Sequence, residues 1–200
     1  MTVTRERFEE GMTYAAYKDQ MTRNRERLEE NERTVELGRD DLAFFKGLPH
    51  ALDVLVLTED WCGDAIANVP ILGRLAQESG KLNLRIFLRD QNLDLMDQYL
   101  KDGQHRSIPT FVFFGDDFRE LGHWIERPAS ITAQREVAMA ELFAGAPELA
   151  GVAPGTSPAL LSDEARARVM QFYGEFRAQT RAESDAAVVR ELRELIAAAL

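Results

Sequence analysis

The stretch VLVLTEDWCGDA, from Val54 to Ala65, decides the fold of this 200-residue chain. It opens on four apolar residues in a row, a pattern typical of a strand that is covered on both faces of its sheet. A helical pattern follows and extends to Gly80. Cys62, the one cysteine of the chain, therefore stands where a strand gives way to a helix. Because unpaired backbone N–H groups at a helix N-terminus favour a thiolate, this position points to thiol chemistry.

Strand and helix patterns alternate downstream of this stretch. Apolar runs bounded by turn residues predict strands over 52–57, 82–88, 110–114 and 119–125. Helical periodicity predicts helices over 64–79, 93–100 and 130–144. The order βαβαββα predicts an α/β fold, a mixed central sheet of about four strands with helices on both faces.

Both ends of the chain extend beyond this core. Residues 4–46 indicate two helices with breaks near Thr22 and Gly38. A linker of small residues over 150–158 precedes two further helices, the first of them capped by Ser162. We therefore divide the chain into an N-terminal helical extension over 1–48, a core over 49–147, and a linker with C-terminal helices that pack on the core over 148–200.

Three motifs in this core resemble those of thioredoxin. The motif WCGDA at 61–65 shares its Trp-Cys-Gly, and Pro70 stands where thioredoxins carry a proline in the same helix. The loop RSIPT at 106–110 resembles the thioredoxin Arg-Gly-Ile-Pro-Thr. The resemblance covers residues 50–146, and the single-cysteine motif is similar to that of a bacterial thioredoxin-like subfamily. It implies a thioredoxin-like fold with extra N- and C-terminal helices, Cys62 as the attacking cysteine, and a cis proline that faces it.

Three positions depart from the family pattern. Ala65 replaces the second cysteine, which in thioredoxin resolves the mixed disulfide. Val56 and Ile86 stand where the resemblance places a buried aspartate and a lysine that assist proton transfer. Neither side chain titrates, so the resolving thiol and its proton relay are both missing. The pattern favours either monothiol chemistry or a site without catalysis.

The charges around the cysteine predict its reactivity. Asp64, in the first turn of the helix, and Glu59 and Asp60 before it all disfavour a thiolate. Arg106, on the proline loop, compensates for them if it points inward. Since the helix N-terminus also favours the thiolate, we expect the pKa of Cys62 to lie modestly below its usual value of about 8.5.

The same segments supply candidate substrate-binding residues. Trp61, beside the thiol, is expected to form part of a shallow apolar platform. Ile108 can offer its backbone to an extended peptide, and Pro109 shapes the loop. Asp64 could contribute a hydrogen bond, and Gly63 lies between it and the cysteine. These five residues make up the predicted substrate site.

Composition narrows the classes of function. With 45% apolar residues the chain can bury a core, and no apolar run has the length of a membrane span. The N-terminus lacks the pattern of a secretory signal, so we expect a reducing cytoplasm. A net charge of −10 argues against general binding to nucleic acids or anionic membranes. His50, His105 and His123 lack metal-ligand spacing, and the sequence indicates neither a metal nor a cofactor.

Two classes of function fit these observations. In a monothiol thiol–disulfide oxidoreductase, Cys62 would attack a disulfide-containing protein, and a low-molecular-weight thiol would resolve the product. In a non-catalytic module, the site would bind an extended peptide, or Cys62 would be reversibly capped as a redox sensor. The retained cysteine favours the first class, and the missing partners at Ala65, Val56 and Ile86 favour the second. The sequence leaves open whether the chain is an enzyme and whether its terminal helices form a homodimer.

Overall fold

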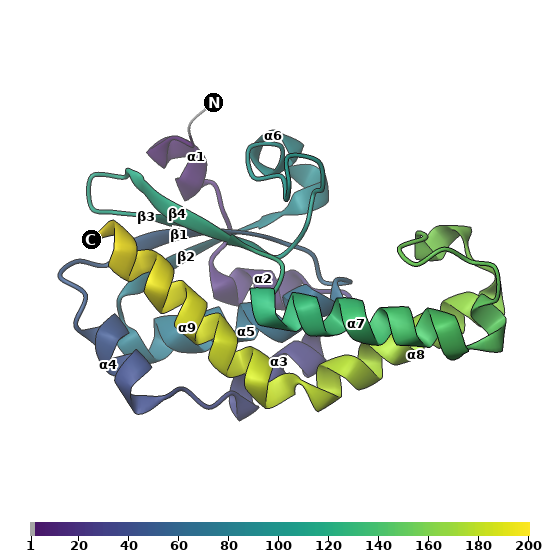
Figure 1. Cartoon of the computed structure of the whole chain (residues 1–200). Helices are drawn as coiled ribbons and strands as arrows, with labels where there is room; N and C mark the ends of the chain where they lie inside the picture. The colour runs from purple at the N-terminus through teal and green to yellow at the C-terminus, as the bar shows by residue number, and fades with distance from the viewer. Residues whose placement is uncertain (1–2) are drawn as a thin grey trace. The chain divides into compact units, whose positions relative to one another are not determined.

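The structure of the chain, a computed structural model, describes residues 3–200 (Figure 1). Their contacts divide the chain into two compact units. The first, which we call the core unit, comprises the chain up to Arg127 together with Asp185–Leu200, and the second, the hairpin unit, comprises Pro128–Ser184. This division does not follow the expected borders at 48/49 and 147/148. The N-terminal helices share one core with the sheet, whereas the helix after the last strand belongs to the hairpin unit.

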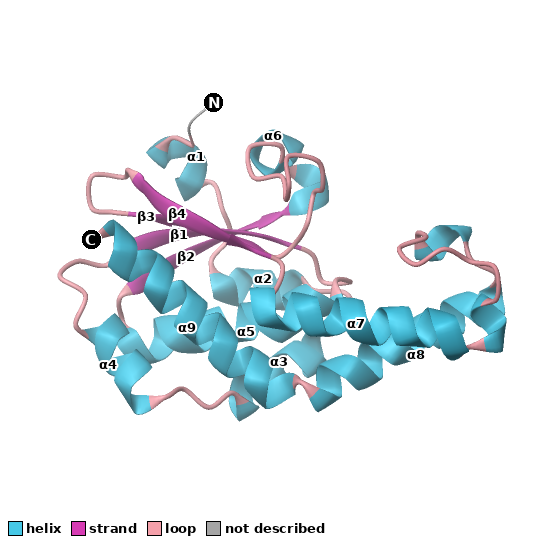
Figure 2. Cartoon of the chain, in the orientation of Figure 1, coloured by secondary structure: helices cyan, strands magenta, loops and turns pink. Residues whose placement is uncertain are grey.

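Among the described residues, the core unit is built on a four-stranded mixed sheet (Figure 2). Its strands lie in the order β2-β1-β3-β4, with β1 and β2 parallel and the other neighbours antiparallel. Their bounds are β1 Leu52–Thr58, β2 Leu82–Leu88, β3 Thr110–Phe114 and β4 Glu120–Ile125. The predicted mixed sheet is confirmed, and each strand ends within one residue of its predicted bounds.

Alternate residues of β1 pack on opposite faces of the sheet, as the two-residue repeat of a strand requires. Val54 and Val56 join a larger apolar core, and Leu55 and Leu57 join a second core on the other face. The larger core is covered by α2 Tyr14–Gln20, α3 Arg25–Thr34, α4 Arg39–Lys46, α5 Gly63–Ser79 and the part of α9 (Arg181–Ala199) that lies in the core unit. The second core is covered by α1 Arg5–Glu9 and α6 Leu93–Met96. Helices therefore lie on both faces, as predicted.

The N-terminal extension departs from its prediction. Between residues 3 and 50 the structure has four short helices, α1 to α4, so the expected number of two is wrong. The expected breaks near Thr22 and Gly38 are present, but a further break at 10–13 separates α1 from α2. There Met12 pairs with Ile86 of β2 through two backbone hydrogen bonds of 2.9 and 2.8 Å. Because the edge of a sheet offers unpaired backbone groups, this pairing outweighs the local helical pattern.

The C-terminal helix α9 packs, from Asp185 onward, in the larger core. Val188, Leu192 and Ile196 are fully buried there, at the spacing of one helical face. The carboxylate of Glu191 accepts a hydrogen bond of 2.7 Å from the indole N–H of Trp124 in β4. This part of the helix therefore closes the core unit beside its last strand.

Helix α5 carries the cysteine at its start. Cys62 is the N-cap residue, and its carbonyl accepts the first helical hydrogen bond, from the N–H of Ile66 at 3.0 Å. Gly80 ends the helix with a φ of 65°, a conformation that glycine adopts without strain. The apolar residues of the helix are buried against the sheet; they include Ile66, Val69, Ile71, Leu72 and Leu75. This packing fixes the position of the first turn and of the thiol.

The hairpin unit contains α7 Ala129–Gly145 and α8 Asp163–Gln179, joined by a segment with two 3-10 turns, Pro147–Leu149 and Pro158–Leu160. Ser162 caps α8 by accepting a hydrogen bond of 3.2 Å from the N–H of Ala165, as the sequence predicts. The unit has a small apolar core of its own, formed by Leu142, Leu149, Leu161, Ala165 and Val169. Throughout residues 3–200, no helix has the length and apolar character needed to cross a membrane.

Candidate functional site

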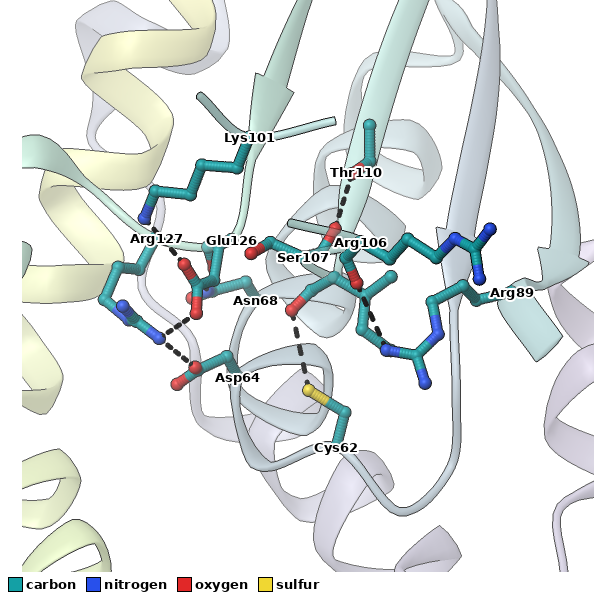
Figure 3. Close-up of polar contacts among 11 residues, drawn as sticks. Cys62, Asp64, Asn68, Arg89, Lys101, Arg106, Ser107, Thr110, Glu126 and Arg127 are labelled. Carbon is teal, nitrogen blue, oxygen red and sulfur yellow. Dashed lines mark hydrogen bonds and ion pairs between the residues drawn. The ribbon is translucent and has the colours of Figure 1, made fainter. Parts of the chain in front are cut away.

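Cys62 lies at the N-terminus of α5, opposite the loop that precedes β3 (Figure 3). Its Sγ donates a hydrogen bond of 3.5 Å to the backbone carbonyl of Ile108. The peptide bond between Ile108 and Pro109 is cis, as the resemblance implies. Gly63 is the first residue of the helix, and the cysteine side chain is partly buried against both apolar cores. The fold therefore brings together the WCGDA motif and the proline loop, two of the three motifs that carry the resemblance.

The environment of the thiol disfavours its ionisation. Burial raises the pKa of Cys62, and the Asp64 carboxylate raises it further. Hydrogen bonds from the backbone N–H groups of Ala65 and Asp64 lower the pKa, and the charge of Glu126 raises it again. The pKa ends above its ordinary value, so the expectation of a modestly lowered pKa is wrong. The sequence showed the helix N-terminus and the Asp64 charge, but the dominant desolvation comes from tertiary packing.

Four charged side chains form a continuous series of ion pairs beside the thiol. We call it the charge chain; it runs Asp64, Arg127, Glu126, Lys101 (Figure 3). Nη2 of Arg127 donates to Asp64 Oδ2 at 2.5 Å and also to Glu126 Oε1. Nζ of Lys101 donates to the other carboxylate oxygen of Glu126 at 2.7 Å. Acids and bases thus alternate from the first turn of α5, past the end of β4, to the segment before β3.

Arg127, inside the charge chain, is buried, with 7% of the residue exposed. Burial disfavours its charge, but the charges of Asp64 and Glu126 outweigh this effect and raise the pKa of Arg127. Its Nε and Nη1 atoms are buried and have no hydrogen-bond partner within the described part of the chain. Buried unpaired donors are costly, so this arginine calls for an explanation beyond packing.

Glu126 has a positive φ of 71°, which is uncommon for a residue other than glycine. Its N–H donates a hydrogen bond of 2.7 Å to the carbonyl of Pro109, and its carbonyl accepts one of 2.9 Å from Nδ2 of Asn68 on α5. The turn after β4 is thus bonded to both the proline loop and α5. Sequence reasoning missed Asn68, Lys101, Glu126 and Arg127. The sequence signal that could have found the last two was the pair of opposite charges, Glu126 and Arg127, between the end of the predicted strand over 119–125 and Pro128.

Trp61 is the most exposed residue of the predicted substrate site, with 44% of its surface accessible. The guanidinium of Arg89 lies 4.9 Å from the centre of its ring and donates a hydrogen bond of 3.1 Å to the carbonyl of Arg106. The Arg106 side chain forms a bidentate ion pair with Asp97, with distances of 2.6 and 2.9 Å. Arg106 is therefore occupied by Asp97, while Trp61 presents an apolar surface next to the cysteine in the chain.

The two acids before the thiol fix their own loop. Oε1 of Glu59 accepts a hydrogen bond of 2.8 Å from the N–H of Asp90, and burial raises the pKa of Glu59. Oδ2 of Asp60 accepts a hydrogen bond of 2.8 Å from the N–H of Thr22. These bonds attach the loop between β1 and α5 to the end of β2 and to the N-terminal extension. Both acids, expected to modulate the thiol, are thus engaged in holding the loop that presents it.

The other side of the site, which we call the underside, consists of Val56, Ile86, Ala65 and Tyr17. Val56 of β1 pairs with Ile86 of β2, and both are buried in the core that Cys62 contacts. Ala65, at the position of a resolving cysteine, is fully buried. Burial raises the pKa of Tyr17 to about 12, so its hydroxyl stays protonated at neutral pH. Within residues 3–200, no group of His, Cys, Asp and Glu is arranged to hold a metal ion.

Comparison with known proteins supports the resemblance. A family model described as Thioredoxin matches residues 11–140, more than half of the chain. A protein of unknown function from Pseudomonas aeruginosa is similar in structure over 100% of both chains, with a TM-score of 0.70 and 16% sequence identity. An HIV epitope scaffold is similar over 96% of both chains, with a TM-score of 0.65 and 14% identity. No curated protein matches the chain. At these identities the structural likeness shows a shared fold alone. The family model, together with this shared fold, confirms the predicted thioredoxin-like fold.

Proposed function

Because this chain belongs to the thioredoxin family, we propose that it is a monothiol thiol–disulfide oxidoreductase that works through Cys62 and an external thiol. One observation carries the proposal. The only cysteine lies partly exposed at the start of α5, with its sulfur 3.5 Å from the Ile108 carbonyl of the proline loop. A disulfide in an extended segment could lie along that loop and bring a sulfur to Cys62. Since Ala65 supplies no second thiol, the mixed disulfide has to be resolved from outside.

The proposed cycle consists of two exchange steps on a mixed disulfide between a protein and a low-molecular-weight thiol. The Cys62 thiolate attacks the small-thiol sulfur, and the protein sulfur leaves as a thiolate that takes up a proton. A second small thiol, as its thiolate, then attacks the same small-thiol sulfur and releases the Cys62 thiolate. The protein cysteine is reduced and one free small thiol is oxidised, because it leaves as a disulfide with the small thiol that the mixed disulfide already held. Such a cycle fits the reducing cytoplasm of a bacterium, which is where we place it.

The raised pKa of Cys62 limits the first step. At neutral pH a minor fraction of the thiol is ionised, and the thiolate is the attacking species. The rate of attack should therefore increase with pH until the thiol is fully ionised. At neutral pH the proposed enzyme should be slower than one whose cysteine has a lowered pKa.

Mass spectrometry of the intact protein tests the proposal. Treatment with an oxidised low-molecular-weight thiol should add one adduct to the wild type and none to Cys62→Ser. An excess of the reduced thiol should remove the adduct and return the free cysteine. If Cys62 stays unmodified in the folded protein under conditions that modify it in the unfolded chain, the oxidoreductase proposal is wrong.

A second function, binding of an extended segment without catalysis, is favoured by the apolar underside. Val56 and Ile86 offer no proton carrier, and the thiol is poorly ionised. In this case the exposed Trp61 and the backbone of the proline loop would hold the segment. Ala65→Cys discriminates between the functions, because disulfide reduction gained by this variant would show a competent site. Peptide binding that persists in Cys62→Ser, without exchange in the wild type, would support the binding module. A redox sensor would form the adduct but release no reduced substrate.

A further inference from the structure

The charge chain places two carboxylates beside the only thiol, and one guanidinium binds both. Nη2 of Arg127 donates to Asp64 and to Glu126 (Figure 3). We propose that Arg127 is a positioning residue for Cys62: it holds the two carboxylates in ion pairs and offsets their repulsion of the thiolate. The inference deepens the proposed function and rests on it, since a tuned thiol matters only where the thiol reacts.

Because Arg127 and the two carboxylates are largely buried, the charge of Arg127 compensates strongly for the carboxylate charges. The side chains of Arg127, Asp64 and Glu126 are 5%, 17% and 18% exposed. Charges held away from bulk water are screened weakly. A surface pair such as Arg74 with Glu78, whose side chains are about one third exposed, is screened far more. Without the charge of Arg127, Asp64 and Glu126 would therefore repel the thiolate more strongly than surface carboxylates would.

The backbones that carry the two carboxylates do not depend on Arg127, which fixes the direction of their oxygens. Asp64 belongs to the first turn of α5, which the sheet fixes. Glu126 is bonded through its backbone to Pro109 and Asn68, and Lys101 holds its second oxygen. Removal of the Arg127 side chain should thus leave both negative charges near the thiol. The expected result of that removal is a less ionised cysteine.

A structural role alone does not account for Arg127. Its Nε and Nη1 donors are buried without partners among residues 3–200, which costs free energy that an apolar side chain of similar length would not incur. Buried ion pairs are often no more stabilising than well-packed apolar residues. The position therefore gains little stability from an arginine, but it gains a fixed positive charge where two carboxylates meet.

The other polar groups near the thiol do not provide the same compensation. Burial raises the pKa of Tyr17 to about 12, so its hydroxyl carries no charge at neutral pH. Glu59 and Asp60 accept backbone hydrogen bonds from neighbouring segments, Arg106 is paired with Asp97, and Arg89 lies over the Trp61 ring. Arg127 is the cation that both opposing carboxylates share.

The rate at which iodoacetamide alkylates Cys62, measured against pH, tests this inference. The reagent is uncharged, so its rate follows the thiolate fraction. We expect Arg127→Met to slow alkylation at neutral pH by about three- to tenfold, which corresponds to a rise of about half to one unit in the apparent pKa of Cys62.

Three further variants serve as comparisons. Asp64→Asn should accelerate alkylation by about threefold, because it removes a repelling charge. Arg127→Lys keeps the charge and should restore most of the wild-type rate. Arg74→Met, which removes an arginine charge from the surface of α5, should leave the rate unchanged.

The double variant Arg127→Met/Asp64→Asn separates a role of Arg127 through the carboxylates from a direct effect of its charge on the thiol. If Arg127 acts through the carboxylates, Arg127→Met should have a markedly smaller effect in the Asp64→Asn background than in the wild type. An equal effect in both backgrounds, or an unchanged pH profile in Arg127→Met, would overturn the inference. Thermal unfolding shows whether each variant is folded, and Arg127→Lys and Asp64→Asn keep the test decisive if Arg127→Met is not. Alkylation can be measured without enzymatic turnover. If the pH profiles are as expected but the protein shows no oxidoreductase activity, only the proposed function is refuted.

Discussion

The underside and the charge chain border the same thiol, yet they are built from opposite chemistry. On the underside, Val56 of β1 and Ile86 of the edge strand β2 pair with each other and are buried. In the charge chain, four ionised side chains alternate in sign, and its central arginine comes from the turn after β4. The strands beneath the cysteine therefore contribute packing, whereas its charge environment comes from α5 and from loops. The underside thus stabilises the fold around the thiol, whereas the charge chain controls the ionisation of the thiol.

The energies of the two regions differ accordingly. Full burial of a valine or isoleucine stabilises the fold by about 1.5–3 kcal/mol relative to an exposed position. A buried ion pair contributes little net stability, because desolvation offsets most of the attraction. Substitutions in the underside should therefore change the free energy of unfolding first, and substitutions in the charge chain should change the reactivity of Cys62 first.

The largest effect is expected when a carboxylate is introduced into the underside. Val56→Asp places an acid among buried apolar residues and should lower the free energy of unfolding by about 4 kcal/mol at neutral pH. Burial raises the pKa of such an acid in the folded state. The loss should therefore be smallest below the pKa of the unfolded chain, about 3.9, and grow as the pH rises through the folded value. Urea unfolding at several pH values measures it.

Val137→Asp is the matched control, because Val137 is 62% exposed on α7. That variant should change the free energy of unfolding by no more than about 0.5 kcal/mol. Equal losses in the two variants would mean that water reaches the underside, and the contrast between the two regions would then be wrong.

The parts of the fold that depend on local pattern could be predicted from the sequence. The strands were placed within one residue, because apolar runs bounded by turn residues define them. Cys62 at the start of α5 followed from the change of pattern at that residue, and Gly80 marked the end of the helix. The loop that contains Pro109 came from the family resemblance and lies opposite the thiol.

The rest depends on contacts between distant segments. The break before α2 exists because Met12 pairs with Ile86, and no local signal shows that pairing. Arg127 meets Asp64 across 63 residues of sequence, so neither residue identifies the other. The raised pKa of Cys62 has the same origin, since desolvation is a property of the assembled core. Sequence reasoning thus located the thiol but not the groups that control it.

A smaller effect is expected at the link between α5 and the charge chain. Asn68→Ala removes the donor to the Glu126 carbonyl, which leaves that carbonyl unpaired. The Oδ1 atom of Asn68 is itself buried without a partner in the described chain, so its removal recovers part of the loss. We expect a net decrease of about 1 kcal/mol in the free energy of unfolding, measured by urea denaturation.

In the control Asn83→Ala, an exposed amide is lost, and the free energy of unfolding should stay within about 0.5 kcal/mol of the wild-type value. A loss as large as that of Val56→Asp would show that stability around the thiol depends on this link as much as on the underside, and would contradict the contrast between the two regions.

The smallest effect is a loss of stability at alkaline pH that belongs to Cys62. Because its pKa is raised in the folded protein, the folded state holds the thiol proton more tightly than the unfolded chain does. The contribution is fully present below the unfolded pKa, about 8.5, and is lost as the pH rises through the folded value. The thiol is partly exposed, so the loss of stability should stay below about 1 kcal/mol.

The control is Cys62→Ser, because Tyr17 also lowers stability at higher pH in both proteins. If wild type and variant lose stability in parallel from neutral to alkaline pH, desolvation of the thiol is weaker than the structure indicates. The thiol would then ionise in the folded protein much as it does in the unfolded chain.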